Sequence, residues 1–360
     1  MLSSIVSIFI LGILVIVHEA GHFVVARMAG VRVLRFSMGF GPRLFTWRRG
    51  HTEYAVSAIP LGGYVKMAGE QQEGRTHQPW EYLSKPVSIR ALIVAAGPFV
   101  NYLVAVLSLW VVFIIGYPEL LPIAGKVVPN MPAASVGLQP GDHIESIDGE
   151  ALQTWDEMTA IIHRSPGQAL RFGIRRQDHM LPIVITPLSK TVVDPLGHST
   201  TVGQIGIQPN GEFRALKLPP VQAAVRAWQQ HLAWLKQTFL ALWSMLTGHL
   251  SMRDSVTGPI GIVMLTSEAV KLGISPVLFL ISLFSLSLSV FNLFPIPILD
   301  GGHLLFLAIE RLRGRPVSLA VQERSIQVGF ALLLTLVVVV CANDLSRFGL
   351  FEKVAGWFHH

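Results

Sequence analysis

The chain has 360 residues, of which 51% are hydrophobic and only 14% are charged. This balance excludes an ordinary soluble enzyme and indicates a membrane protein. The formal net charge of +6 does not indicate a nucleic-acid-binding protein, because a membrane topology accounts for the positions of the basic residues.

Four apolar stretches are long enough to cross a bilayer as a helix, which takes about 20 residues. They lie within residues 1–30, 88–116, 274–310 and 325–343. The first stretch is expected to be retained as a membrane helix, because it lacks the basic start and the small-residue cleavage site of a signal peptide. The predicted fold class is a polytopic α-helical membrane protein with four transmembrane helices.

Lysine and arginine are concentrated in the connections between the first and second spans and between the third and fourth. Because such residues are enriched in cytoplasmic loops, both connections are expected to be cytoplasmic. Residues 117–275 and both termini are then extracytoplasmic. The single cysteine, Cys341, falls in the last span, so the extracytoplasmic part is held together by packing without an internal disulfide.

Residues 31–87 are expected to form a membrane-associated β region and a loop on the cytoplasmic side. Apolar and polar residues alternate over residues 51–59, a pattern typical of a strand with one buried face. The next residues, Leu-Gly-Gly-Tyr at 61–64, are a turn signal before another short strand. The region therefore predicts a β-hairpin beside the membrane.

Residues 121–209 are expected to form a small extracytoplasmic domain of short strands with one helix. Within it, residues 133–149 resemble the signature of PDZ domains, in which glycine-containing pairs make tight turns between strands. The pairs here are Gly141-Asp142 and Asp148-Gly149. A PDZ fold would offer a strand edge and a groove for an extended peptide. A generic small β domain is the alternative.

Residues 220–250 carry apolar residues at spacings of three and four, which places these residues on one face of a helix. They are Val221, Val225, Trp228, Leu232, Leu235, Phe239, Leu242 and Leu246. Because the segment is also rich in tryptophan, the pattern favours an amphipathic helix in the membrane interface. An amphipathic helix packed on the outer domain is the alternative.

The sequence His18-Glu19-Ala-Gly-His22 lies inside the first span. On an α-helix, residues four apart share a face, so the two imidazoles can hold one metal ion while Glu19 reaches the attacking water. This is the HExxH pattern of zinc peptidases, in which the glutamate is the general base. A charged side chain at the centre of a membrane helix costs about 2.5–3.5 kcal/mol, and a bound metal compensates that cost. The alternative is that the histidines only hydrogen-bond neighbouring helices.

A catalytic zinc ion needs a third protein ligand and an open position. Asp300 ends the run Asn-Leu-Phe-Pro-Ile-Pro-Ile-Leu-Asp, residues 292–300, after the third span. Pro295 and Pro297 break the helix, and irregular backbone at membrane depth is tolerated where it lines a cavity or packs against protein. Asp300 is therefore the expected third ligand, with a helix-capping role as its alternative. His303 is a rival ligand of lower rank.

Two other functions use some of the same residues. A zinc transporter or sensor would place histidine and aspartate within spans, but it has no use for Glu19 beside His18 or for a peptide-binding domain. A membrane scaffold with a PDZ domain would need no HExxH motif. The protease hypothesis accounts for the most features, and one catalytic Zn²⁺ is the expected cofactor.

Three features together resemble the site-2 proteases, in particular their bacterial RseP-like branch: the HEAGH motif, the pattern N-x-x-P-x-P-x-L-D-G-G over residues 292–302, and a PDZ domain between the second and third spans. The resemblance implies an intramembrane zinc endopeptidase. It gives roles to the zinc ligands His18, His22 and Asp300, the general base Glu19, and the substrate-binding residues Asn292, Gly39 and Gly41. Residues 258–261, Gly-Pro-Ile-Gly, match a further family stretch.

The resemblance also implies partners and a location. The expected substrates are single-span membrane proteins already trimmed by a site-1 protease, such as an anti-sigma factor, and leftover signal peptides. Membrane lipids are expected to surround the protein, nucleic acid is not an expected partner, and the location is the bacterial inner membrane. Well-known members carry two tandem PDZ domains, whereas residues 121–209 accommodate one, a departure that bears on how substrates are filtered by size.

Overall fold

The computed structural model describes residues 2–71, 76–193, 199–249 and 258–347. Parts of three predicted segments lie outside the described residues: 72–75 of the cytoplasmic loop, 194–198 of the PDZ domain and 250 of the interfacial helix. The chain divides into two compact units, one of residues 1–111 with 256–360 and one of residues 112–255.

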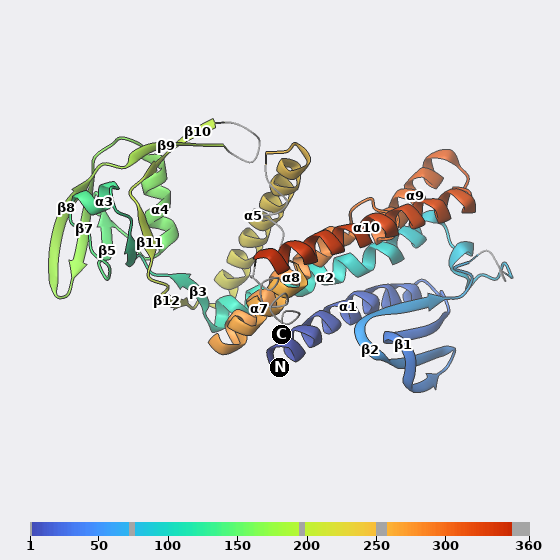
Figure 1. Ribbon diagram of the computed structural model, residues 1–360. Helices are drawn as coiled ribbons and strands as arrows, with labels where there is room; N and C mark the ends of the chain where they lie inside the picture. Colours follow the sequence, from blue (N-terminus) through green and yellow to red (C-terminus); the bar gives the residue numbers. More distant parts are fainter. Residues whose placement is uncertain (1, 72–75, 194–198, 250–257, 348–360) are drawn as a thin grey trace, which may run out of the picture. The chain divides into compact units, whose positions relative to one another are not determined.

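Four helices of the described residues are long and apolar enough to cross a membrane. They are α1 (Leu2–Met28), α2 (Val87–Ile115), α8 (Ile274–Asn292) and α10 (Leu319–Arg347), as labelled in Figure 1. The first unit adds the short helix η1 (Tyr82–Ser84), α7 (Pro259–Leu272) and α9 (Asp300–Arg313). Residues 274–310, expected as one span, are divided: α8 ends at Asn292 and α9 begins at Asp300, because the prolines between them cannot continue a helix.

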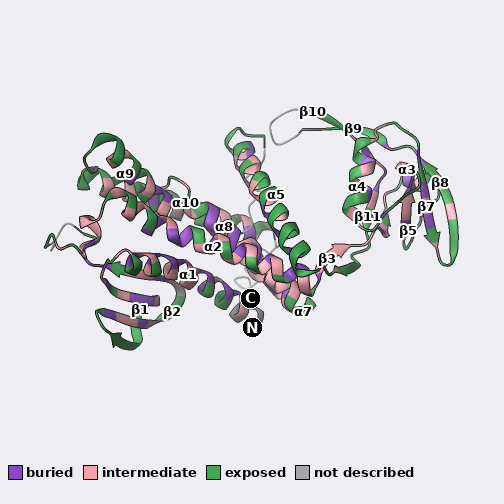
Figure 2. Cartoon of the chain, turned by 180° about the vertical axis from the view of Figure 1, so that it is seen from behind, coloured by how far each residue is buried: buried purple, intermediate pink, exposed green. Residues whose placement is uncertain are grey.

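The four membrane helices differ in how far they are covered by the rest of the chain. About a third of the most apolar stretch is buried in α1, α2 and α8, against 6% in α10. The burial colours of Figure 2 show purple residues along α1, α2 and α8. Three helices therefore form the packed part of the membrane unit, and α10 presents nearly all of its apolar surface to its surroundings.

Strands β1 (Val33–Arg49) and β2 (Thr52–Met67) form an antiparallel sheet that is wider than the predicted hairpin. Residues 35–38 pair on both sides, with residues 53–56 and with residues 63–66, while the end of β1 pairs with the start of β2. Both strands must bend for this. Gly39 lies at the bend of β1 with φ of +92°, and a Cβ there would lie 2.5 Å from the carbonyl oxygen of Ile59, so only glycine fits.

The sheet lies beside α1 in Figure 1, and two glycines bring it close. A Cβ on Gly12 of α1 would lie 2.7 Å from the carbonyl oxygen of Pro60. A Cβ on Gly63 of β2 would lie 3.3 Å from Cγ of Glu19. Residues 60–66 of β2 therefore run along the helix that carries the HExxH motif.

The described residues of the second unit form short strands and three helices. They contain no disulfide. Its strands are β3 (Tyr117–Leu120), β4 (Ala124–Val127), β5 (His143–Ile147), β6 (Glu150–Ala151), β7 (Leu170–Arg176), β8 (His179–Ile185), β9 (Leu188–Val193), β10 (Ser199–Gln204), β11 (Ile207–Pro209) and β12 (Phe213–Leu216). Its helices are α3 (Pro132–Ser135), α4 (Trp155–Arg164) and α5 (Pro220–Leu246). The main sheet has the order β6-β5-β7-β8, and β4, β9 and β3 pair with β11, β10 and β12.

One apolar core holds the sheet and α4 together. It includes Ile144, Phe172, Ile174 and Ile185, which are at most 1% exposed. The helix α4 starts with a capping box, in which Thr154 and Glu157 satisfy each other's backbone amides. Apolar packing and helix capping thus stabilise this unit, which has no disulfide among its described residues.

The two predicted turns precede and follow β5. Gly141 has φ of +92°, and the Asp148-Gly149 turn between β5 and β6 has positive φ at both residues. Asp142 is fully buried, and its carboxylate accepts two hydrogen bonds from the Arg176 guanidinium, each of 2.7 Å, and one of 2.8 Å from the Gln139 amide. The signature residues therefore shape the turns on both sides of one central strand.

Helix α5 exposes the large apolar residues predicted for one face. Val221, Trp228, Phe239 and Leu246 are 50–82% exposed, whereas the small Ala223 and Ala227 are buried. The expected face is therefore exposed within this unit, and its placement in the membrane interface stays a prediction.

Two carboxylates, one partly buried and one fully buried, connect helices of the first unit. Glu310 of α9 accepts two hydrogen bonds, of 2.5 and 3.1 Å, from Arg90 of α2. Asp344 of α10, fully buried, accepts bonds of 3.1 Å from the amides of Gly258, Ile260 and Gly261 at the start of α7. A carboxylate at a helix N-terminus is stabilised by the free amides there, which gives residues 258–261 a structural role.

Candidate metal centre

His18, Glu19 and His22 lie on consecutive turns of α1. The two histidines are 7% and 8% exposed, and their Nε2 atoms are 3.2 Å apart. The rings meet edge to face, with centroids 4.8 Å apart. This follows from the four-residue spacing, which stacks side chains on one helix face. The two Nε2 atoms therefore face the same place, and neither ring has to donate a proton there.

Asp300 reaches the same place from the first turn of α9. Its Oδ2 atom lies 3.0 Å from Nε2 of His18 and 3.6 Å from Nε2 of His22. The turn that delivers it is tight, because a Cβ on Gly302 would lie 2.5 Å from Cα of Pro297, and one on Gly301 would overlap the carbonyl of Leu293. The two glycines after Asp300 are thus needed to fold the proline segment back on the helix start.

The three ligand atoms fit a zinc ion. Two ligand atoms of a tetrahedral site, each about 2.0 Å from zinc, are about 3.3 Å apart. The three separations here, 3.0, 3.2 and 3.6 Å, are close to that value. The Oδ2 atom of Asp300 is buried, yet it has no hydrogen bond of acceptable geometry despite the short distance to His18. A buried carboxylate oxygen beside two imidazole nitrogens is a donor set that zinc prefers.

Helix α2 backs the two histidines. Nδ1 of His22 lies 2.8 Å from the carbonyl oxygen of Ile93, which leaves Nε2 free to face the centre. A Cβ on Gly97 would lie 2.6 Å from Cε1 of His22 and 2.8 Å from Cε1 of His18. The sequence gives no sign of a role for Ile93, and Gly97 is recognisable only as a glycine inside an apolar helix, which marks close helix packing.

Glu19 faces the β sheet. Its carboxylate lies near the backbone of Val65, and Gly63 lies next to its Cγ atom. Among the described residues, the cluster of close ligand atoms contains His18, His22 and Asp300 and does not contain His303, which is exposed in α9.

The predicted substrate-binding residues lie in separate elements. Asn292 is the last residue of α8 and partly buried, while Gly39 and Gly41 lie in β1 with φ of +92° and +85°. None of the three contributes to the ligand cluster found among the described residues. The structure thus brings together the predicted ligands, while a role of Asn292, Gly39 and Gly41 in substrate binding stays a prediction.

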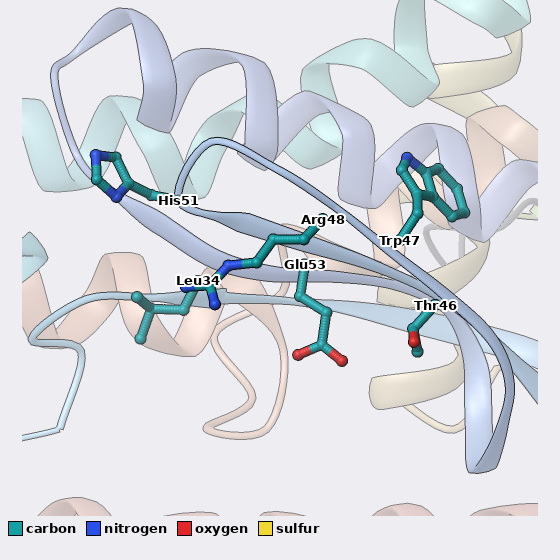
Figure 3. Close-up of a pocket in the computed structure, with 6 residues that line it drawn as sticks. All are labelled: Leu34, Thr46, Trp47, Arg48, His51 and Glu53. Carbon is teal, nitrogen blue, oxygen red and sulfur yellow. The ribbon is translucent and has the colours of Figure 1, made fainter.

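A surface pocket of about 440 Å³ lies elsewhere on the β1–β2 sheet. Figure 3 shows its lining residues, Leu34, Thr46, Trp47, Arg48, His51 and Glu53. Their side chains are spread along the strands and point in different directions. Because a reaction site has polar groups that converge, this pocket is not a competitor to the centre on α1.

Comparisons with known proteins agree with this chemistry. A protein of Rhizobium meliloti (strain 1021), named as a zinc metalloprotease, is 37% identical over 356 residues, which cover 94% of this chain and 95% of that protein. "Regulator of sigma-E protease RseP" of Escherichia coli (strain K12) is 32% identical and covers 94% of this chain and 97% of the relative. That alignment spans 446 residues, so the relative contains sequence that this 360-residue chain lacks.

Solved structures match a smaller part. The PDZ domain of an SdrC-like protein from Listeria monocytogenes is 26% identical and covers 26% of this chain and 88% of its own, with a TM-score of 0.20. The sequence model of "Peptidase family M50" matches residues 6–336, which is nearly the whole chain. The protease hypothesis is therefore confirmed over the transporter and the scaffold. The chain belongs to peptidase family M50, the site-2 protease family, and is an intramembrane zinc metalloprotease.

Proposed function

We propose that this protease hydrolyses peptide bonds within the transmembrane segments of single-span membrane proteins, at one zinc ion held by His18, His22 and Asp300. The observation that carries the proposal is the set of separations among the three ligand atoms, 3.0 to 3.6 Å. Side chains with only a packing role would not place three polar ligand atoms around one buried point, because burying polar atoms without partners is costly.

Glu19 is the proposed general base. When bound, zinc supplies Lewis acidity that polarises the scissile carbonyl and makes water a nucleophile near neutral pH. Glu19 follows His18 directly on α1, so its carboxylate lies beside the ligand cluster, where it takes the proton of the attacking water and gives it to the leaving amine. Asn292, at the end of α8, is proposed to hold the substrate or the oxyanion.

The sheet beside Glu19 is the proposed place for the substrate strand. A helical substrate has its carbonyls in hydrogen bonds, so it must be extended before water can attack. Residues 63–66 of β2 pair with β1 and pass close to Glu19, whose Cγ atom lies next to Gly63. Gly39 and Gly41 bend β1 and so shape this edge, and main-chain pairing with it would hold an extended peptide.

The substrates and the sidedness are also proposals. The name of the Escherichia coli relative concerns regulation of sigma-E, which supports an anti-sigma-factor-like substrate for this chain. The basic connections between spans support placing the PDZ domain and both termini outside the cytoplasm. In that arrangement the PDZ domain would admit substrates already trimmed by a site-1 protease, and leftover signal peptides.

The test compares the native protein with Glu19→Gln after purification in detergent. Glu19→Gln is expected to keep one zinc ion per chain and to lose at least about 100-fold in cleavage rate, the range for general acid-base catalysis. Glu268→Gln is the matched control, because this glutamate is exposed on α7 and pairs only with Lys271 among the described residues. Zinc is measured by atomic absorption, and fragments of a single-span substrate by mass spectrometry.

Two outcomes would contradict the proposal: native cleavage rates in Glu19→Gln, or native protein with bound zinc that cuts none of the single-span substrates. A second pair of substrates, with and without a bulky outer domain, tests the PDZ domain. Equal rates for the pair would refute filtering by size and leave the catalytic proposal untouched.

A further inference from the structure

The second ring nitrogen of His18 faces an asparagine of another helix. Nε2 of His18 points to Asp300 and His22, so this is the nitrogen that faces the metal. Nδ1, on the other side of the ring, lies 3.2 Å from the carboxamide of Asn101 in α2. Asn101 is fully buried, so its amide has little choice of partner.

The ring chemistry decides which end of the amide belongs there. A neutral imidazole that offers Nε2 to a metal carries its proton on Nδ1, which must then donate to an acceptor. The two ends of an asparagine amide exchange by rotation and are assigned from their partners. With its nitrogen toward His18, Asn101 would set two donors against each other, and its Oδ1 is left buried without a partner. Rotation of the amide turns this oxygen to the ring, where it accepts the Nδ1 proton, and moves the NH2 group to the place that the oxygen occupied.

Asn101 is fixed in place by its own helix and by α8. Ser285 of α8 donates to the carbonyl oxygen of Asn101 over 2.7 Å, and Ser282 donates to that of Ala105 over 2.8 Å. Ile93, Gly97 and Asn101 are each four residues apart in α2, so they share one face. On this face, the carbonyl of Ile93 lies beside His22 and the amide of Asn101 lies beside His18. Gly97, between them, leaves space for both imidazole rings.

We propose that Asn101 is a positioning residue for the metal centre: its amide oxygen accepts the Nδ1 proton of His18 and so fixes the tautomer and the ring orientation in which Nε2 binds zinc. The inference rests on the proposed function, since it assumes that His18 is a zinc ligand. Partners of metal-bound histidines contribute about 10- to 100-fold to metal affinity, and Asn101 is expected to lie in that range.

The experiment measures zinc affinity, without reference to activity, by chelator competition on metal-free protein in detergent. Asn101→Leu keeps the branching and the number of side-chain heavy atoms but has no acceptor, and it is expected to bind zinc about 10- to 100-fold more weakly. Asn101→Asp keeps an acceptor oxygen and is expected to bind zinc at least as tightly as the native protein. Ser287→Ala is the matched control, because its hydroxyl, among the described residues, donates to the carbonyl oxygen of Leu283 in the same helix and does not contact Asn101.

A spectroscopic reading separates positioning from general damage. With Co²⁺ in place of zinc, Asn101→Leu is expected to change the visible absorption of the bound ion, while Asn101→Asp and Ser287→Ala keep the native bands. The melting temperatures of the metal-free forms are compared in the same detergent, so a folding defect is recognised as such. If Asn101→Leu does fail to fold, Asn101→Asp still decides, because weakened zinc binding in this variant overturns the inference.

Equal zinc affinity of the native protein and Asn101→Leu overturns the inference and leaves the proposed function standing. Native protein that binds no zinc overturns the proposed function instead. The two failures are therefore distinguishable in one titration.

Discussion

Gly97→Ala tests the packing of α2 against the two histidines. The added methyl would lie 2.6 Å from Cε1 of His22 and 2.8 Å from Cε1 of His18, where ordinary carbon contacts begin near 3.4 Å. The His22 ring must therefore retreat by about 1 Å, although metal ligands tolerate only about 0.2 Å, and its other nitrogen is held by Ile93. Because misplacement of about 1 Å costs about 100-fold, we expect at least that loss of cleavage rate, with zinc affinity lowered as well.

The helix itself should tolerate the change, since alanine is favoured over glycine in a helix by about 1 kcal/mol. Gly329→Ala in α10 is the control: it gains the same propensity, and its methyl meets nothing closer than 3.4 Å, at Pro297. Zinc titration and cleavage of a single-span substrate are measured for both variants. Gly97→Ala that binds zinc and cuts substrate like the native protein would refute the reasoning, because the rings would then have room that the structure denies them.

Two further predictions concern buried carboxylates. Asp344→Leu leaves the amides at the start of α7 without their acceptor, so we expect a lower melting temperature in detergent and faster hydrogen exchange in α7; unchanged exchange would contradict the capping role. In the second unit, burial alone would raise the pKa of Asp142, but the Arg176 guanidinium and the Gln139 amide hold this pKa below its ordinary value. A carboxyl with a lowered pKa stabilises the fold above its unfolded pKa of about 3.9 and loses this effect as the pH falls through the folded pKa. The protection of amides in β5 and β7, taken relative to their intrinsic exchange rates at each pH, should therefore decrease below about pH 4. Asp142→Asn should remove much of this decrease; equal pH dependence of protection in both proteins would rule the carboxyl out as its cause.

The part of the site that the sequence predicts is the part set by local geometry. The spacing of His18 and His22 fixes their convergence once α1 is a helix, and Pro295 and Pro297 mark where a helix must stop and Asp300 can turn inward. These features need no knowledge of which helices are neighbours.

The contacts that complete the site depend on tertiary packing. Asn101 and Gly97 read as ordinary residues of an apolar helix until α2 is placed against α1. The doubling of the sheet was likewise missed, because alternation in the sequence predicts strands but not that residues 35–38 pair on both sides. Local patterns therefore predicted the proposed ligands, while the residues proposed to orient them became visible only in the packed helices.

The ion pair between Arg90 and Glu310 joins parts of the chain that are synthesised at very different times. The ribosome finishes α1 and α2 long before Asp300 and the rest of α9 exist, and domains of a chain form in the order of their synthesis. With Asp300 as the proposed third ligand, the metal centre is therefore incomplete during membrane insertion until α9 is made and Glu310 pairs with Arg90.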